Sequence, residues 1–495
     1  MWTSINQALN IIDNFVWSVP LMVLIIAGGL LLTIRLGLLQ IRKLPLALKW
    51  MLQNEEGGKG EISSFSALCT ALSATIGTGN IVGVATAVCA GGPGALFWMV
   101  VAAFLGMATK YSEGLLAVKY RTVAEDGHSL GAPFYYIELG MGKKFKWLAK
   151  IFAFFGVCVG LFGIGTFSQV NGISSAVHGF FDPNDAFTVK ILPFLGEYSW
   201  SVVIASLILS FCVAAVLIGG VKRIASVSQI IVPFMAVIYF VFAVILICCN
   251  ITKVPAAFAT IVTAAFSPKA ITGGAVGSML IAMQKGVARG IFSNEAGLGS
   301  APIAAAAAQT NSPVRQGLVS MTGTFIDTIV ICTMTGLSIV LTGAWQVEGL
   351  EGVQVTTYAF QHGLPFPAQF SSFILMLCLV FFAFTTILGW DYYSERCLEY
   401  LSGGNMKHVK IFRWIYILAV FIGPYMTVSA VWTIADIFNG LMAIPNMIAL
   451  FALSGVIVKE TRAFFQHAKE EALAEHRSFE EVCEENLNEE EAPAN

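Results

Sequence analysis

SATIGTGNIVG, residues 73–83, interrupts an apolar stretch that is otherwise long enough to cross a lipid bilayer. The segment contains three glycines, and each glycine weakens a helix by about 1 kcal/mol relative to alanine. Unwound backbone inside a membrane is tolerated only where it lines a cavity or is buried in protein. A break at residues 77–80 would therefore offer N–H groups to an anion and C=O groups to a cation. The alternative is that the glycines only let a neighbouring helix approach closely.

Composition indicates an integral membrane protein. Of the 495 residues, 57% are hydrophobic and 12% are charged, whereas soluble proteins have about 25% charged residues. Eleven apolar stretches are long enough to cross a bilayer core of about 30 Å. These stretches lie at residues 13–35, 63–88, 92–118, 147–178, 198–219, 226–249, 271–309, 315–343, 369–395, 410–430 and 432–458. The first stretch has no basic residue before it, so we expect a membrane span and not a cleaved signal peptide.

The distribution of basic residues predicts the orientation. If the N-terminus lies outside, 22 of the 28 Lys and Arg fall in cytoplasmic segments and 3 fall in outer loops. We therefore expect a multi-pass protein of the cell membrane with a cytoplasmic C-terminus. Residues 459–495 contain 11 Glu and are predicted to form an acidic tail that begins as a helix and ends in disorder. The 10 Cys are scattered without a CxxC or Cys/His cluster, so no metal site is indicated.

A second interrupted stretch favours the binding interpretation of the first. Residues 271–309 would make a straight helix of about 58 Å at 1.5 Å per residue, so this helix must bend or unwind. If residues 1–62 form an accessory helix and a linker, the two interrupted helices open two five-helix units, 63–249 and 250–458. Because five is odd, the second unit enters the membrane from the opposite side. Glycine-interrupted helices in corresponding positions of two inverted halves are typical of the substrate site of a secondary transporter.

Other functional classes have less support in the sequence. An enzyme would need a nucleophile, a base and an orienting group or a metal motif, and neither HExxH nor GxSxG occurs. A channel does not require two interrupted helices in inverted repeats. No feature points to nucleic acid or to an obligatory protein partner. A proton-coupled carrier of the same fold remains the main alternative, because Asp327 and Glu113 lie within predicted spans.

Four segments resemble the alanine or glycine:cation symporter family, the sodium:alanine symporters. They read GTGNIVGVATAV, GGPGALFWMVVAAFLGMATKYSE, SNEAGLGSAPIAAAAA and WTIADIFNGLMAIPN, and the resemblance covers residues 13–462. The chain departs from the family at Val100, where a second tryptophan is usual. The resemblance implies a leucine-transporter-like fold, all-α, with a 5+5 inverted repeat and an accessory N-terminal helix. It also implies Na⁺-coupled uptake of small neutral amino acids such as alanine, glycine or serine, without a cofactor.

On that fold, the first break is the expected substrate site. The backbone N–H groups of Gly77, Thr78 and Gly79 are expected to bind the substrate carboxylate, and Asn80 to bind the substrate or Na⁺. Further residues are expected to line the pocket or to bond the substrate. These are Thr75, Phe167, Gln169, Gln284 and Trp390. Gln284 would meet the substrate amine, with help from carbonyl groups freed by a break near Gly286.

The expected Na⁺ site is built from neutral oxygen atoms, because the resemblance places two hydroxyl groups beside the first broken helix. The expected ligands are Ala74, Gly77, Asn80, Thr385 and Thr386. The alternative for the two threonines is that each hydroxyl only bonds the carbonyl four residues earlier in its own helix.

Charged residues inside predicted spans are candidate gates or proton sites. They are Glu113, Lys285, Arg289, Glu295 and Asp327. Arg289 and Glu295 are expected to form a gate. Asp327 either pairs with Lys285 or binds a proton or a cation.

The fourth predicted span and the ninth contain further notable residues. Glycines at positions 156, 160, 163 and 165 are expected to pack against the broken helix. Asp391 and Glu395 are expected to take part in salt bridges toward the inner end of the ninth span.

Overall fold

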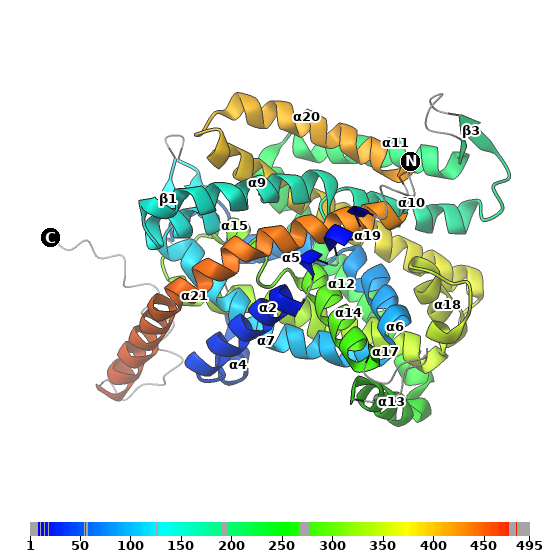
Figure 1. The fold of residues 1–495 in the computed structure, drawn as a ribbon, viewed down its shortest axis with the longest axis horizontal. Helices are drawn as coiled ribbons and strands as arrows, with labels where there is room; N and C mark the ends of the chain where they lie inside the picture. The colour runs from blue at the N-terminus through cyan, green and yellow to red at the C-terminus, as the bar shows by residue number, and fades with distance from the viewer. Residues whose placement is uncertain are drawn as a thin grey trace.

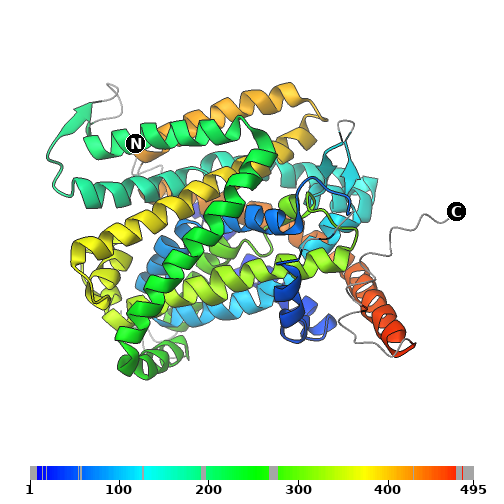
Figure 2. The same ribbon diagram turned by 180° about the vertical axis from the view of Figure 1, so that it is seen from behind.

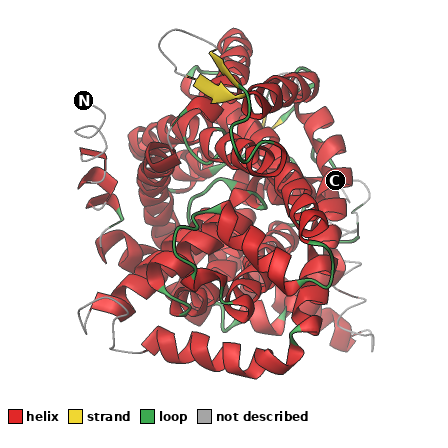
Figure 3. Cartoon of the chain, turned by 90° about the vertical axis from the view of Figure 1, so that its right-hand side faces the viewer, coloured by secondary structure: helices red, strands yellow, loops and turns green. Residues whose placement is uncertain are grey.

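The protein is described from a computed structural model, which is almost entirely helical (Figure 3). The described residues are 8–474 and 482, apart from residues 10, 14, 18, 54, 56–57, 125–126, 191–196, 267–276 and 427. The predicted start of the seventh span and most of the predicted acidic tail therefore lie outside the described residues. The tail prediction is met in part, because the last helix continues without a break to Ala474.

The first half of the chain contains the first interrupted helix. Its elements are α2 (Val19–Arg35), α3 (Leu39–Arg42), α4 (Leu44–Trp50), α5 (Ser64–Thr75), η1 (Gly79–Gly83), α6 (Val84–Gly91), α7 (Gly94–Lys119), β1 (Thr122–Val123), β2 (Ser129–Leu130), α8 (Pro133–Tyr135), η2 (Tyr136–Gly140), η3 (Lys143–Phe145), α9 (Lys146–Phe162), α10 (Phe167–Phe181), β3 (Thr188–Lys190), β4 (Glu197–Ser199), α11 (Trp200–Leu217), α12 (Gly220–Cys249), η4 (Ile251–Lys253) and α13 (Val254–Phe266). The strands form two short antiparallel hairpins, β1 with β2 and β3 with β4, which the sequence did not predict.

The second half contains the second interrupted helix. Its elements are α14 (Gly277–Asn294), α15 (Ala301–Ala305), α16 (Pro313–Thr324), η5 (Phe325–Cys332), α17 (Thr333–Thr342), η6 (Ala344–Gln346), α18 (Val353–Gly363), α19 (Ala368–Leu401), α20 (Met406–Ile422), η7 (Gly423–Tyr425) and α21 (Val428–Ala474). Helix α16, the π-helical segment η5 and helix α17 follow one another without a gap and act as one long span.

The helices confirm a multi-pass membrane protein. Within the described part of the chain, seven helices are long and apolar enough to cross a membrane, or eight if the bent first interrupted helix counts as one span. The stretches predicted at 13–35, 271–309 and 410–430 also contain helices, but these do not meet that measure of length and hydropathy. The count of eleven spans, the inverted repeat and the orientation of the termini therefore stay predictions.

The two interrupted helices lie inside the bundle. Figures 1 and 2 show α5, α6 and α14 near the centre, with α11 and α20 along one edge. Helix α7 packs against both α14 and α16, and α19 packs against α5, α9, α10 and α12. By contrast, α11 and α12 expose large apolar side chains such as Phe211 and Ile230. That arrangement is typical of lipid-facing helices around a polar interior.

Candidate functional site

The first interrupted helix breaks at residues 76–78, which overlap the break predicted at residues 77–80. Helix α5 begins at the cap residue Ser63, whose side chain accepts a hydrogen bond from the Ser66 N–H, and ends at Thr75. The following Ile76 is extended, and the chain resumes as the π-helical turn η1 at a bend of 50°. The N–H of Gly77 donates to Asn80 Oδ1 at 2.9 Å. Asn80 thereby satisfies one of the backbone groups that the break sets free.

Gln169 on α10 satisfies a second backbone N–H group of the first break, that of Thr78. Its side-chain oxygen accepts a hydrogen bond of 2.9 Å from the Thr78 N–H, and its amide group donates to the carbonyl of Ile164 at 2.9 Å. The hydroxyl oxygen of Thr78 is buried without a hydrogen-bond partner. An unpaired buried hydroxyl is costly unless a bound molecule pairs with it. The structure thus brings four predicted residues together at the N–H groups of the first break. They are Gly77, Thr78, Asn80 and Gln169.

Gln169 is positioned by a third interruption, which the sequence did not predict. The predicted fourth span is two helices, α9 and α10, joined by residues 163–166. The glycines before this joint were expected to contact the first broken helix, and that expectation is wrong. A Cβ on Gly156 would meet Cys397, and a Cβ on Gly160 would meet Ser394, so these glycines pack against α19. The physical reason is that α9 runs beside α19, where only a glycine leaves room for the side chains of that helix.

The two threonines of α19 differ in what they contact. The Thr386 hydroxyl lies 3.2 Å from the carbonyl oxygen of Ile76 at the first break and 3.0 Å from the Phe382 carbonyl. The Thr385 hydroxyl bonds the Phe381 and Phe382 carbonyls of its own helix and reaches the sulfur of Met235 at 3.6 Å. Only Thr386 therefore joins the break in the conformation described.

Helices α5 and α19 pack tightly against one another near the first break. Ala74, another predicted ligand, is fully buried, and a Cβ on Gly389 would lie 2.8 Å from the Ala74 Cβ. Thr75 is the last residue of α5, and its hydroxyl bonds the Ala71 and Leu72 carbonyls. A Cβ on Gly79 would lie 3.1 Å from the Cα of Ser293. The first break is therefore in direct contact with the end of α14.

The second interrupted helix breaks at residues 295–300, after α14 ends at Asn294. Glu295 has φ 58°, and Gly297 and Gly299 have φ 89° and 81°. A left-handed conformation suits glycine but is uncommon for other residues, and it recurs at functional sites. The Glu295 carboxylate accepts hydrogen bonds from Trp390 Nε1 at 2.7 Å and from the Ser300 hydroxyl at 2.5 Å. Trp390 is 1% exposed, and its indole N–H joins α19 to the second break.

Asp327 connects the two breaks. Its carboxylate accepts hydrogen bonds from Asn80 Nδ2 at 2.7 Å, from the Ser293 hydroxyl at 2.8 Å and from the Thr328 hydroxyl at 2.6 Å. It is fully buried, and no ion pair among the described residues includes it. Lys285 is exposed on α14, so the suggested pairing of Asp327 with Lys285 is wrong. The side chain of a residue on the far surface of the helix cannot reach the buried junction.

Lys110 and Glu113 of α7 support the second break from the other side. The Lys110 ammonium donates to the Asn294 carbonyl at 2.7 Å, which places a positive charge at the C-terminus of α14. The Glu113 carboxylate accepts from the Gly297 N–H at 3.1 Å and from Asn446 Nδ2 at 2.7 Å. These two residues hold the unwound segment in place.

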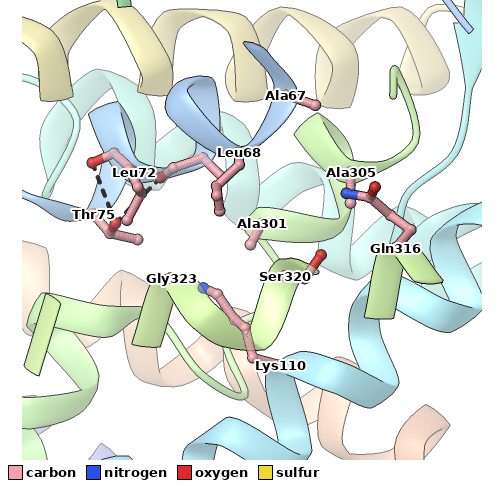
Figure 4. A pocket seen from close by; sticks show the side chains of 11 residues that line it. Ala67, Leu68, Leu72, Thr75, Lys110, Ala301, Ala305, Gln316, Ser320 and Gly323 are labelled. Atoms are coloured by element: carbon pink, nitrogen blue, oxygen red, sulfur yellow. Dashed lines mark hydrogen bonds between the residues drawn. The ribbon is translucent and has the colours of Figure 1, made fainter. Parts of the chain in front are cut away.

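A small cavity lies beside Lys110. It has a volume of about 10 Å³, about the space that one water molecule needs. Figure 4 shows the Lys110 side chain reaching toward it, with Thr75 and Leu72 of α5 on one side and Ser320 and Gln316 of α16 on the other. The Gln316 side-chain oxygen is buried without a hydrogen-bond partner. The cavity therefore lies among α5, α7, α15 and α16, and its lining is mostly apolar.

Arg289 forms an ion pair, but not with the expected partner. Its guanidinium donates to both carboxylate oxygens of Asp436 at 2.9 and 2.6 Å. It also lies 5.0 Å from the Trp432 ring, which stacks near Phe292 with a centroid distance of 4.8 Å. The expected pair with Glu295 is wrong, because Glu295 lies past the end of α14 and bonds Trp390 and Ser300 instead. The ion pair and the two rings therefore join α14 to α21.

We expect the Arg289–Asp436 pair to act as one unit in the transport that the family resemblance implies. Arg289→Ala and Asp436→Ala should each lower substrate uptake by about tenfold, and the double variant should be no worse than either single one, because a bidentate pair contributes about 1.5 kcal/mol or more of coupling. The measurement is a double-mutant cycle on initial uptake rates. Arg289→Lys keeps the charge and loses the fork geometry, so an intermediate rate is expected. Additive losses in the double variant would contradict a gate made by this pair.

Three predicted site residues lie away from the two breaks: Gln284, Phe167 and Lys285. Gln284 donates to the Trp17 carbonyl at 3.3 Å. Gly286 is helical and packs against α7, where its Cβ would lie 2.2 Å from the Ala95 carbonyl, so no carbonyl is freed there. Phe167 packs with Ala419 and Val431. Gln284, Phe167 and Lys285 therefore do not join the residues around the breaks.

Several residues at the junction around Asp327 were not predicted from the sequence. Ser293 and Thr328 bond Asp327, Asn294 Nδ2 bonds the Thr328 hydroxyl at 3.0 Å, and Asn446 bonds the second break. The available signal was that each is a hydrogen-bonding side chain inside an apolar stretch. Spacing along the sequence did not show which of them face one another.

The fold and this junction define a class: a multi-pass membrane carrier with two interrupted helices whose polar breaks meet in the interior. The profile of the sodium:alanine symporter family matches residues 2–478. The chain belongs to this family.

Individual relatives agree over almost their whole length. An uncharacterised transporter of Haemophilus influenzae is 54% identical, covering 94% of this chain and 97% of its own. The sodium/alanine symporter AgcS of Methanococcus maripaludis is 46% identical, covering 94% and 98%. The probable sodium/glutamine symporter GlnT of Bacillus subtilis is 36% identical, covering 94% and 92%. Family membership supports the function of a cation-coupled amino-acid symporter and gives no support to an enzymatic one.

Proposed function

We propose that this protein takes up small neutral amino acids, with alanine, glycine and serine as the preferred substrates, by symport with Na⁺ and alternating access. The relatives named for alanine and for glutamine support an amino-acid substrate, and two of them are named as sodium symporters. The breaks of α5/α6 and α14/α15 supply the binding groups, and the membrane is the site of action.

The observation that carries the coupling to a cation is the Asp327 junction. A fully buried carboxylate inside a membrane protein needs a proton or a cation to offset its charge. Around it stand the side-chain oxygens of Ser293 and Thr328, with the amide of Asn80 at the first break. Hard cations favour such oxygen ligands, and unwound carbonyls add to them in carriers of this kind. We propose that Na⁺ replaces the hydrogen bonds that Asp327 now accepts.

The substrate carboxylate is proposed to bind at Gly77 and Thr78. Their N–H groups are held here by Asn80 Oδ1 and Gln169 Oε1, so an amino acid would take the place of these acceptors. The unpaired Thr78 hydroxyl adds a donor at the same point. Thr386 and Gln169 close tightly on Gly77, where a Cβ would lie 2.5 and 2.8 Å from their oxygen atoms, and we propose that this crowding favours a small substrate.

The test is uptake of labelled alanine into proteoliposomes under an inward Na⁺ gradient, compared with a pH gradient at equal Na⁺. Accumulation with Na⁺ alone supports the proposal. One Na⁺ crossing about 100 mV releases about 2.3 kcal/mol, which suffices for accumulation of about 50-fold. Accumulation driven by protons without Na⁺ would overturn it. Competition by glycine, serine and glutamine then measures the size limit of the pocket.

Thr386→Ala is expected to raise the Na⁺ concentration for half-maximal uptake by about tenfold, because the Thr386 hydroxyl contacts the first break, which Asn80 connects to the proposed Na⁺ position at Asp327. Thr385→Ala is the matched control on the same helix, and its hydroxyl bonds only its own helix and Met235. We expect it to change the Na⁺ requirement by less than about twofold. Equal effects of the two variants would argue against a role of the Thr386 contact in Na⁺ binding. The readout is the Na⁺ dependence of initial uptake.

A further inference from the structure

Asp391 is a buried carboxyl group that does not take part in the proposed Na⁺ or substrate site. It lies on α19 one residue after Trp390 and is fully buried. Both of its carboxylate oxygens are buried and lack a hydrogen-bond partner. Asp327, Glu113 and Glu295, the other buried carboxylates named above, each accept at least two hydrogen bonds. Asp391 is therefore a group for which the fold provides no donor.

Two donors on α20 that interact electrostatically with Asp391 already form hydrogen bonds with other groups. Arg413 on α20 donates to both carboxylate oxygens of Glu395 at 2.6 and 2.9 Å. The Tyr416 hydroxyl, also on α20, lies 2.8 Å from the Ile387 carbonyl and 3.0 Å from the Gly165 carbonyl. Glu395, Arg413 and Tyr416 are the groups whose electrostatic interaction with Asp391 the described structure shows. On the other side of α19, α9 presents Gly156 and Gly160, which bring no charge.

The local charge balance decides the state of Asp391. Arg413 and Glu395 neutralise one another, so an ionised Asp391 would be an extra negative charge without a counter-ion. Burying an unpaired carboxylate costs far more than burying the neutral acid. The group therefore takes up a proton and stays neutral in this conformation.

We propose that Asp391 is a proton-binding site, distinct from the Na⁺ site, that is protonated in the conformation described and releases its proton to water when α20 separates from α19. The exchange is a plain acid dissociation: the O–H bond of the carboxylic acid breaks, water takes the proton, and the carboxylate remains. The inference concerns Asp391 alone and does not depend on which ion drives transport.

The position of Asp391 links its proton to the substrate site. Tyr416 ties α20 to the carbonyl of Ile387 on α19 and to the carbonyl of Gly165 in the joint between α9 and α10. Gln169, four residues after Gly165, bonds the Thr78 N–H at the first break. Loss of the proton places a charge in the α19–α20 contact and favours conformations in which water or Arg413 reaches Asp391. Protonation thus stabilises the conformation in which Gln169 holds the first break.

Infrared difference spectroscopy tests the proton directly, without a transport assay. The spectrum of the purified protein minus that of Asp391→Asn at neutral pH should contain the carbonyl-stretch band of a protonated carboxylic acid. Glu395→Gln is the matched control, because Glu395 is ionised in its pair with Arg413. Its difference spectrum should show loss of a carboxylate band instead. Absence of the protonated-acid band in the Asp391→Asn difference would overturn the proposal. If Asp391→Asn does not fold, Asp391→Leu gives the same comparison with an apolar residue.

The functional consequence is a pH dependence of uptake that this residue controls. At saturating Na⁺ on both sides, wild-type uptake should change with pH over the range in which the protein stays folded, because the proton-bound form of Asp391 is favoured at low pH and the proton is released as the pH rises. Asp391→Asn mimics the protonated acid, so its uptake should vary by less than about twofold over that range. A pH profile of Asp391→Asn equal to that of the wild type would contradict the link to transport. Failure of Na⁺ to drive uptake would overturn the proposed function and leave the infrared result standing.

Discussion

Asp327→Ala should lower Na⁺-driven alanine uptake by about 100-fold or more. Each hydrogen bond to a charged group contributes about 1.5–3 kcal/mol, so the loss of two of the three that Asp327 accepts accounts for that factor. The variant also leaves the buried Asn80 amide and the Ser293 hydroxyl without their present acceptor. Since these residues belong to the two breaks, both halves of the site lose their common anchor. Initial rates of labelled alanine uptake, with protein amount matched by quantification in the vesicles, give the measurement.

Two further variants separate the charge of Asp327 from its hydrogen bonds. Asp327→Asn keeps the shape and removes the charge, so we expect normal folding with a Na⁺ requirement raised by about tenfold or more. Ser338→Ala is the control in the same long span, because the Ser338 hydroxyl is buried but bonds only the Met334 carbonyl of its own helix. It should transport at close to the wild-type rate. Unchanged Na⁺ dependence in Asp327→Asn would exclude this carboxylate as the source of coupling.

The first break could be predicted because its signal is local. Three glycines and Asn80 within a few residues of an apolar stretch are enough to place an interruption, and the structure has it at Ile76–Thr78. The length of the second interrupted stretch likewise demanded a break, although glycines inside α14 suggested an earlier position. Gly286 and Gly290 instead serve helix packing against α7, where a Cβ would meet Ala95 and Met99. Glycine in a membrane helix has both uses, and only the neighbours distinguish them.

The partners of charged residues could not be predicted, because pairing depends on the rotation of each helix. Arg289 and Asp436 are 147 residues apart in sequence, and nothing local marks them as partners. The joint between α9 and α10 escaped prediction for a related reason. Its glycines resemble those of a close helix contact, and it is the carbonyl groups of Ile164 and Gly165, bonded by Gln169 and Tyr416, that make a break there stable.

Gly77→Ala should abolish transport while the protein still folds, and it tests a close approach of two side chains to the first break. A Cβ on Gly77 would lie 2.5 Å from the Thr386 hydroxyl oxygen and 2.8 Å from Gln169 Oε1. Both side chains would have to move, and a displacement of about 1 Å at a binding site can cost about 100-fold in rate. Gly77 does not need a positive φ, so backbone strain is not the cause of the expected loss.

Gly83→Ala is the matched control for Gly77→Ala, because the nearest atom to its Cβ is the Thr78 carbonyl oxygen at 4.0 Å. Both changes favour helix by about 1 kcal/mol, so a loss confined to Gly77→Ala would come from crowding at Thr386 and Gln169. Uptake and alanine binding, measured on both variants after each shows a cooperative melting transition, decide between the causes. Equal loss of uptake in both variants would mean that transport requires the helix to unwind further at the first break. Helix stability at the break would then limit transport, and the space around Gly77 would not.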